Sequence, residues 1–89
     1  MKETKSLEFK SEVTNTFLKT VSAYANYGDG EIIFGITDDG RVIGINDPVS
    51  ACLDLENKIN DAMNPVPEYS LDIQKDSTIV LSVYEGQYK

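Results

Sequence analysis

Residues 31–45 of the 89-residue chain read EIIFGITDDGRVIGI, and this stretch decides the fold. The run over residues 31–37 predicts a strand, because isoleucine, phenylalanine and threonine favour an extended backbone. Asp39-Gly40 is typical of a two-residue hairpin turn, and it predicts a return strand over Arg41–Ile45. A central hairpin is therefore the first element that we expect.

A short strand and a helix are predicted on the N-terminal side of this hairpin. Residues 7–10 alternate between apolar and charged side chains, which predicts a strand with Glu8 and Lys10 on the face opposite the core. Apolar residues recur at helical spacing over roughly residues 14–27. Gly28-Asp29-Gly30 ends this helix, because glycine accepts a positive φ just past a helix.

On the C-terminal side, local signals predict a second helix. Asp47 can cap its first turn, and Pro48 suits the first helical position. One side of this segment is apolar as far as Met63, and Pro65 and Pro67 end the helix.

Two more alternating runs complete the predicted sheet. Residues 69–73 and 79–83 place apolar side chains at every second position, on either side of a turn at residues 75–77. The predicted order is β-α-β-β-α-β-β. We expect an α+β domain with a mixed sheet and two helices packed on one face. The chain stops soon after its last strand, so we expect residues 1–89 to be a single domain and the N-terminal fragment of a longer protein.

The composition excludes several classes of function. Cys52 is the only cysteine and there is no histidine, which rules out an internal disulfide, a cysteine zinc site and catalysis that depends on histidine. No apolar run approaches the ~20 residues that span a bilayer, and the first residues lack a secretory pattern. We therefore expect a cytoplasmic protein with no membrane partner.

Charge is distributed unevenly along the chain. The net charge is −7, which argues against a general polyanion binder. Residues 1–20 nevertheless hold four lysines against three glutamates. A small basic patch near the N-terminus is therefore compatible with the sequence, although acidity that merely keeps the protein in solution explains the same balance.

Three stretches in this order resemble the Schlafen/Alba-like family of DNA-binding domains: ETKSLEFK (residues 3–10), SAYAN (residues 22–26) and IFGITDDGRVIGI (residues 33–45). Domains of this family were earlier labelled divergent AAA modules. They are common at the N-terminus of bacterial transcriptional regulators and RecG-helicase-related proteins. The resemblance therefore implies a DNA-binding module in such a protein.

The candidate nucleic-acid contacts follow from this resemblance. Lys5 and Lys10 are the first phosphate contacts, with Lys19 and Arg41 behind them. Lys10 also has an alternative, because it lies on the Glu8 side of the strand and can form a salt bridge there. Tyr27 and Tyr84 are the tyrosines that we expect to be exposed, where they could stack on bases.

The turn after the first helix adds Asn26 and Gly30 to the candidate contacts. The family usually has asparagine, two residues and then a glycine pair, whereas Asp29 precedes Gly30 here. A carboxylate at this place should weaken contact with a phosphate. The alternative is purely structural, because the C-terminal end of a helix disfavours anions.

An enzyme is the first alternative function. In the Schlafen branch, the resemblance implies a metal-dependent RNA endonuclease that uses Glu3, Glu8 and either Asp38 or Asp39. Carboxylate oxygens suit Mg²⁺ or Mn²⁺, and otherwise no cofactor is expected. Residues five apart on one strand point to opposite faces, so Glu3 must sit on a bend for this set to converge. Solvated surface acids are the simpler interpretation.

A third interpretation is an interaction domain. An open sheet edge could pair with a second copy of the chain and form a homodimer.

Overall fold

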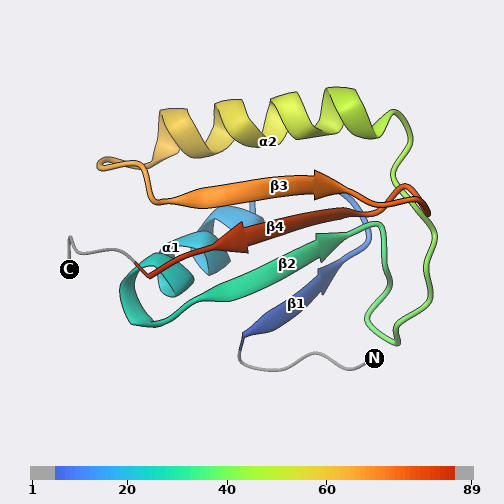
Figure 1. The fold of residues 1–89 in the computed structure, drawn as a ribbon, viewed down its shortest axis with the longest axis horizontal. Coiled ribbons are helices and arrows are strands. Elements are labelled where there is room, and N and C mark those ends of the chain that lie inside the picture. Colours follow the sequence, from blue (N-terminus) through green and yellow to red (C-terminus); the bar gives the residue numbers. More distant parts are fainter. Residues whose placement is uncertain (1–5, 86–89) are drawn as a thin grey trace.

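The computed structural model describes residues 6–85 of the chain. It contains two helices and a four-stranded mixed sheet, which confirms the predicted α+β class (Figure 1). In chain order the elements are β1 (Leu7–Lys10), α1 (Phe17–Tyr27), β2 (Gly30–Phe34), α2 (Pro48–Ala62), β3 (Tyr69–Ile73) and β4 (Ile79–Val83). In this part of the chain, no helix is both long enough and apolar enough to cross a membrane.

The strands lie in the order β1-β2-β4-β3. β1 and β2 are parallel, because α1 carries the chain back to the start of the sheet before β2 begins. The other two pairs are antiparallel, with Ile32 opposite Leu81 and Leu81 opposite Leu71. β1 and β3 are therefore the two edge strands of the sheet (Figure 1).

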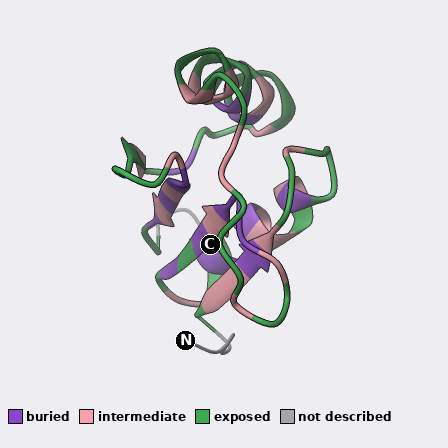
Figure 2. Cartoon of the chain, turned by 90° about the vertical axis from the view of Figure 1, so that its right-hand side faces the viewer, coloured by how far each residue is buried: buried purple, intermediate pink, exposed green. Residues whose placement is uncertain are grey.

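The main core lies between one face of the sheet and the two helices. Alternate residues of β2 and β4 point to this face, as period two requires. In Figure 2 the buried part of α2 is the side that faces the sheet. Ring packing joins α1 to β2, since Phe17 and Phe34 meet edge to face with their centroids 5.6 Å apart. The fully buried core residues are Phe17, Val21, Ile32, Phe34, Leu55, Ile59, Ile79, Leu81 and Val83.

The helix boundaries follow from local chemistry. Asp47 accepts a hydrogen bond from the backbone N–H of Ser50 at 3.3 Å, and Pro48 is the first residue of α2, as predicted. α1 begins at Phe17 rather than near residue 14. The residues before it form a tighter turn, in which Phe17 and Leu18 donate to carbonyls only three positions back.

The predicted return strand over Arg41–Ile45 is reduced to one isolated bridge, between Ile36 and Val42. The backbone N–H groups of Ile43 and Gly44 both donate to the carbonyl of Gly35 at 2.8 Å, so the ladder cannot continue in register. Gly35 has a φ of 95°, which bends the chain away from the line of β2.

The turn at Asp39-Gly40 also differs from the prediction. Thr37 and Arg41 close it, with the Thr37 backbone N–H donating to the Arg41 carbonyl at 2.9 Å. Three residues therefore form the loop instead of two, and Gly40 takes the last position with a φ of 90°. This is the three-residue hairpin loop in which a left-handed residue follows a tight turn.

Candidate functional site

Glu8 and Lys10 point toward the helices. In the parallel ladder Glu8 pairs with Ile32 and Lys10 pairs with Phe34, and both partners face the main core. The prediction that Glu8 and Lys10 lie opposite the core was therefore wrong. Phe9 points to the other face, where its side chain is 2% exposed. The predicted alternation of β1 side chains is present. Because side chains on both faces of β1 are at least partly buried, the apolar positions did not identify the face that packs against the helices.

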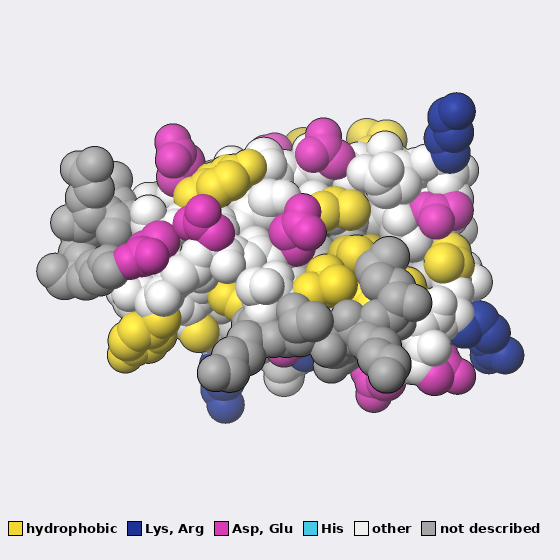
Figure 3. All heavy atoms as spheres, turned by 60° about the horizontal axis from the view of Figure 1, so that its bottom comes forward, with side chains coloured by type: hydrophobic (Ala, Val, Ile, Leu, Met, Phe, Trp, Pro, Cys, Tyr) yellow, Lys and Arg dark blue, Asp and Glu magenta, His cyan; other side chains and the backbone are white. Residues whose placement is uncertain are grey.

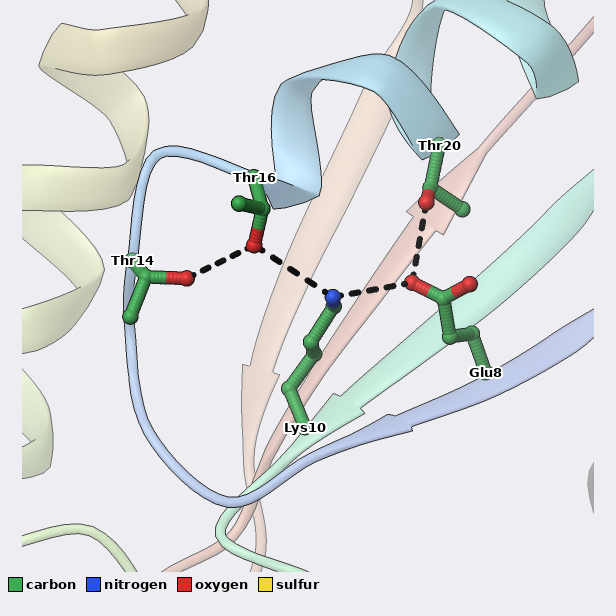
Figure 4. Close-up of polar contacts among 5 residues, drawn as sticks. All are labelled: Glu8, Lys10, Thr14, Thr16 and Thr20. Carbon is green, nitrogen blue, oxygen red and sulfur yellow. Dashed lines mark hydrogen bonds and ion pairs between the residues drawn. The ribbon is translucent and has the colours of Figure 1, made fainter. Parts of the chain in front are cut away.

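Five polar residues join β1 to the start of α1, and we call them the β1–α1 polar cluster (Figure 4). They are Glu8, Lys10, Thr14, Thr16 and Thr20. Thr20 Oγ1 donates to Glu8 Oε2 at 2.9 Å, and Lys10 Nζ lies 3.5 Å from the same oxygen. Lys10 Nζ also donates to Thr16 Oγ1 at 3.5 Å. The salt bridge that the sequence offered as an alternative for Lys10 is present.

This cluster can still be reached from solvent. The Lys10 and Glu8 side chains keep 26% and 30% of their surface exposed. The hydroxyls of Thr14 and Thr16 lie 2.8 Å apart on exposed residues. An ammonium group and two hydroxyls therefore sit together at the edge of the sheet. These three groups can donate hydrogen bonds to an anion. The Glu8 carboxylate opposes such binding, because it competes with the anion for Lys10.

The other candidate basic residues are exposed. Lys19 lies on α1 and Arg41 lies at the end of the hairpin loop. Within residues 6–85, the ion pairs closer than 4 Å are Lys10–Glu8 and Lys58–Asp54, so neither Lys19 nor Arg41 has one there. On the face turned forward in Figure 3, acidic side chains are scattered and the Lys and Arg side chains lie toward the margins. The described residues that are visible on that face form no broad basic patch.

The turn after α1 has a structural explanation. A Cβ atom on Gly30 would lie 2.4 Å from the ring of Tyr24, so only glycine lets that ring pack over the start of β2. Asp29 Oδ1 accepts a hydrogen bond from the backbone N–H of Glu85 at 2.5 Å, which ties the turn to the end of β4. Asn26 is exposed, and its side-chain nitrogen lies 3.5 Å from Ser22 Oγ. Gly30 thus has a packing role that needs no ligand.

Two of the carboxylates proposed for a metal site, Glu8 and Asp38, belong to different elements of the fold. Glu8 is held by Thr20 and Lys10, whereas Asp38 is exposed in the hairpin loop. Asp39 accepts a hydrogen bond from the Thr37 hydroxyl, and this bond, together with the Arg41 backbone, lowers the pKa of its carboxyl group. From Ser6 to Glu85, no three acidic or cysteine residues form a group that could hold a metal ion. Glu3 and Lys5 lie outside the described residues.

Three threonines of the cluster were missed by the sequence reasoning. Thr16 and Thr20 are four residues apart, so they lie on the same side of α1 and both reach the edge strand. That spacing was visible in the sequence. Nothing local indicated that this side of α1 would cross β1.

Comparison with known families gives one match. A family model described as Schlafen, AlbA_2 matches residues 3–89, nearly the whole chain. No curated protein matches the chain.

Proposed function

Because the chain belongs to the Schlafen, AlbA_2 family, we propose that it is a nucleic-acid-binding domain, with DNA as the ligand. The family match over residues 3–89 is the observation that carries this proposal. We further propose that the β1–α1 polar cluster and the neighbouring Lys19 contact the phosphates. Asn26 and Arg41 are proposed as additional contacts to the DNA, further along the chain from the cluster. Gly30 acts only by shaping the turn between α1 and β2.

The chemistry of the cluster supports phosphate contact. Half or more of the hydrogen bonds between proteins and DNA go to the backbone of the nucleic acid, from lysine, arginine and hydroxyl side chains. Lys10, Thr14 and Thr16 offer these donors at one exposed place, linked by contacts of 3.5 and 2.8 Å. Lys19 adds a cation one turn further along α1, with no ion pair to a described residue.

The overall charge limits the size of this interface. A net charge of −7 repels a polyanion at long range, so binding must depend on a few local contacts. Two phosphate contacts give a slope of roughly −2 in a plot of log affinity against log salt concentration. We therefore expect weak binding with a small salt slope.

Glu8 moderates the interface. Its ion pair with Lys10 is partly exposed and 3.5 Å long, and such a pair contributes only about 0–1 kcal/mol. A phosphate oxygen can therefore take the place of the carboxylate beside the ammonium group. The cost of breaking the pair lowers the affinity for DNA.

The sequence and the resemblance also give expectations about the kind of protein that contains this domain and about its oligomeric state. A module of this kind belongs in bacterial transcriptional regulators or RecG-helicase-related proteins, and we propose such a context here. A homodimer stays a prediction that sedimentation at two protein concentrations tests. A metal-dependent nuclease likewise stays a prediction, since Glu3, one of its three proposed carboxylates, lies outside the described residues.

The proposal is tested by measuring affinity for labelled single-stranded and duplex DNA across a salt series. Lys10→Gln and Lys19→Gln should each weaken binding and reduce the salt slope by about one. Lys58→Gln is the matched control, since Lys58 lies on α2 and pairs with Asp54. Binding that is undetectable at low salt, or equal effects of all three variants, would contradict the proposed interface.

A further inference from the structure

A hollow of about 380 Å³ lies between α1 and the segment that follows α2. Ser22, Ala25 and Asn26 of α1 form one wall. The opposite wall is formed by the end of α2 and the residues after it, among them Met63, Asn64, Pro65 and Pro67. Its volume is within the range of small-molecule sites, which runs from about 300 to 1,000 Å³.

The lining of this hollow is neutral. None of its lining residues carries a charge, although 26% of the residues in the chain are charged. The lining residues with polar side chains are Ser22, Asn26 and Asn64. An anion would find no cation in this lining and a cation would find no carboxylate. The lining therefore favours a neutral ligand with its own hydrogen-bonding groups.

The two amides have hydrogen-bonding capacity to spare. The Asn26 side-chain nitrogen makes one long contact, 3.5 Å to Ser22 Oγ, and no side-chain hydrogen bond is formed by Asn64 with a described residue. A carboxamide presents a donor and an acceptor side by side, and this pair matches the edge of a nucleobase. Met63 and the two prolines supply apolar surface for the faces of a planar ring.

One side of α1 connects this hollow to the proposed phosphate contacts. Lys19, Ser22 and Asn26 are spaced i, i+3 and i+7, so they lie along a single stripe of the helix. Seven residues of helix extend about 10 Å. A single strand of DNA that runs along this side of α1 can therefore place a phosphate at Lys19 and a neighbouring base at Asn26.

We propose that this hollow binds an unpaired nucleobase between the amides of Asn26 and Asn64. The inference rests on the proposed function, and it adds a preference for single-stranded over duplex nucleic acid. A base inside a duplex is stacked and paired and cannot enter the hollow. Single-stranded nucleic acid should therefore bind more tightly than a duplex of the same sequence.

The test is titration of the full ¹⁵N-labelled chain with adenosine, which is an uncharged nucleoside, and with ribose as a control without a base. We expect adenosine to shift the side-chain amide signals of Asn26 and Asn64, with no dependence on salt, and ribose to leave them unchanged. Asn26→Ala and Asn64→Ala should each weaken adenosine binding roughly three- to tenfold, the effect of one hydrogen bond. Asn57→Ala should have no effect, because this exposed asparagine of α2 lies outside the hollow.

The outcomes separate this inference from the proposed function. If DNA binds with the expected salt slope but adenosine shifts neither amide, the base site is wrong and the phosphate interface stands. If adenosine binds in the hollow and DNA does not bind at any salt concentration, the base site stands and the proposed function fails. Equal affinity for single strand and duplex would also contradict the base site.

Discussion

Lys10 Nζ lies 3.5 Å from Glu8 Oε2, on the side of β1 that faces α1. The ammonium group is thus held between a carboxylate of its own strand and the Thr16 hydroxyl at the start of α1. Because the pair is partly exposed, it is weak enough for an incoming phosphate to displace the carboxylate. This relationship predicts how a substitution of Glu8 changes the affinity for DNA.

Glu8→Gln should strengthen binding to DNA. Glutamine keeps an oxygen that can accept the hydrogen bond from Thr20, but it removes the charge that competes for Lys10. We expect up to about fivefold tighter binding at low salt, as the loss of an exposed ion pair allows. Fluorescence anisotropy with a labelled strand measures this change. An unchanged or weaker affinity would contradict the competition between Glu8 and phosphate.

Leu55→Ala should lower the free energy of unfolding by about 3 kcal/mol, because removal of a large buried side chain leaves a cavity in the core. Leu55 is 0% exposed between α2 and the sheet. Leu53→Ala is the matched control, since Leu53 is 58% exposed on the same helix and its loss should cost close to nothing. Urea denaturation measures both values. Equal destabilisation by the two variants would mean that α2 packs with another face.

Gly30→Ala should destabilise the fold by roughly 1–3 kcal/mol, because the new methyl group overlaps the ring of Tyr24. If the overlap is the cause, Gly30→Ala should cost less when it is combined with Tyr24→Leu, and a double-mutant cycle measures this coupling. Additive effects of the two substitutions would rule out the overlap. A loss of DNA affinity in a fully folded Gly30→Ala protein would instead assign Gly30 to the ligand.

The β3–β4 turn should make stability depend on pH. Thr78 donates to Asp76 Oδ1 from its backbone N–H at 3.0 Å and from its hydroxyl at 2.6 Å, and these bonds lower the pKa of the Asp76 carboxyl group. The stabilisation is complete above the ordinary aspartate pKa of about 3.9, and it is lost as the pH falls through the lower pKa of the folded state.

Asp76→Asn should therefore be less stable than the parent chain at pH 6, with a difference that shrinks as the solution is acidified below about pH 4. Thermal unfolding across this pH range measures the difference. Asp38→Asn is the control. Asp38 lies in the other hairpin loop, and its side chain accepts no hydrogen bond from a described residue. A difference that grows on acidification would contradict this role of Asp76.

Much of the fold follows from local signals in the sequence. The alternation over residues 79–83 predicted a strand correctly because period two depends only on neighbours in the chain. Asp47 and Pro48 marked the start of α2 through their own capping chemistry. The return strand after Gly40 was not predicted correctly. The Gly35 carbonyl takes two N–H groups there, and that geometry arises only when the chain folds.

The candidate site divides in the same way. Glu8 and Lys10 are two positions apart on one strand, so their salt bridge could be anticipated from the sequence. Their contacts with Thr16 and Thr20 could not, because these depend on how α1 crosses β1. The hollow beside Asn26 also could not be predicted from the sequence, since Asn64, which lines it, is far from Asn26 in the chain.

The central claim is that DNA meets this domain at β1 and the start of α1, and a map of amide shifts on addition of single-stranded DNA at low salt tests it most directly. The account predicts that signals from Lys10, Thr14, Thr16 and Lys19 move and return toward their free positions as salt is added, while the exposed side of α2 around Asp54 stays unchanged. Shifts concentrated on α2, or none near β1, would contradict it.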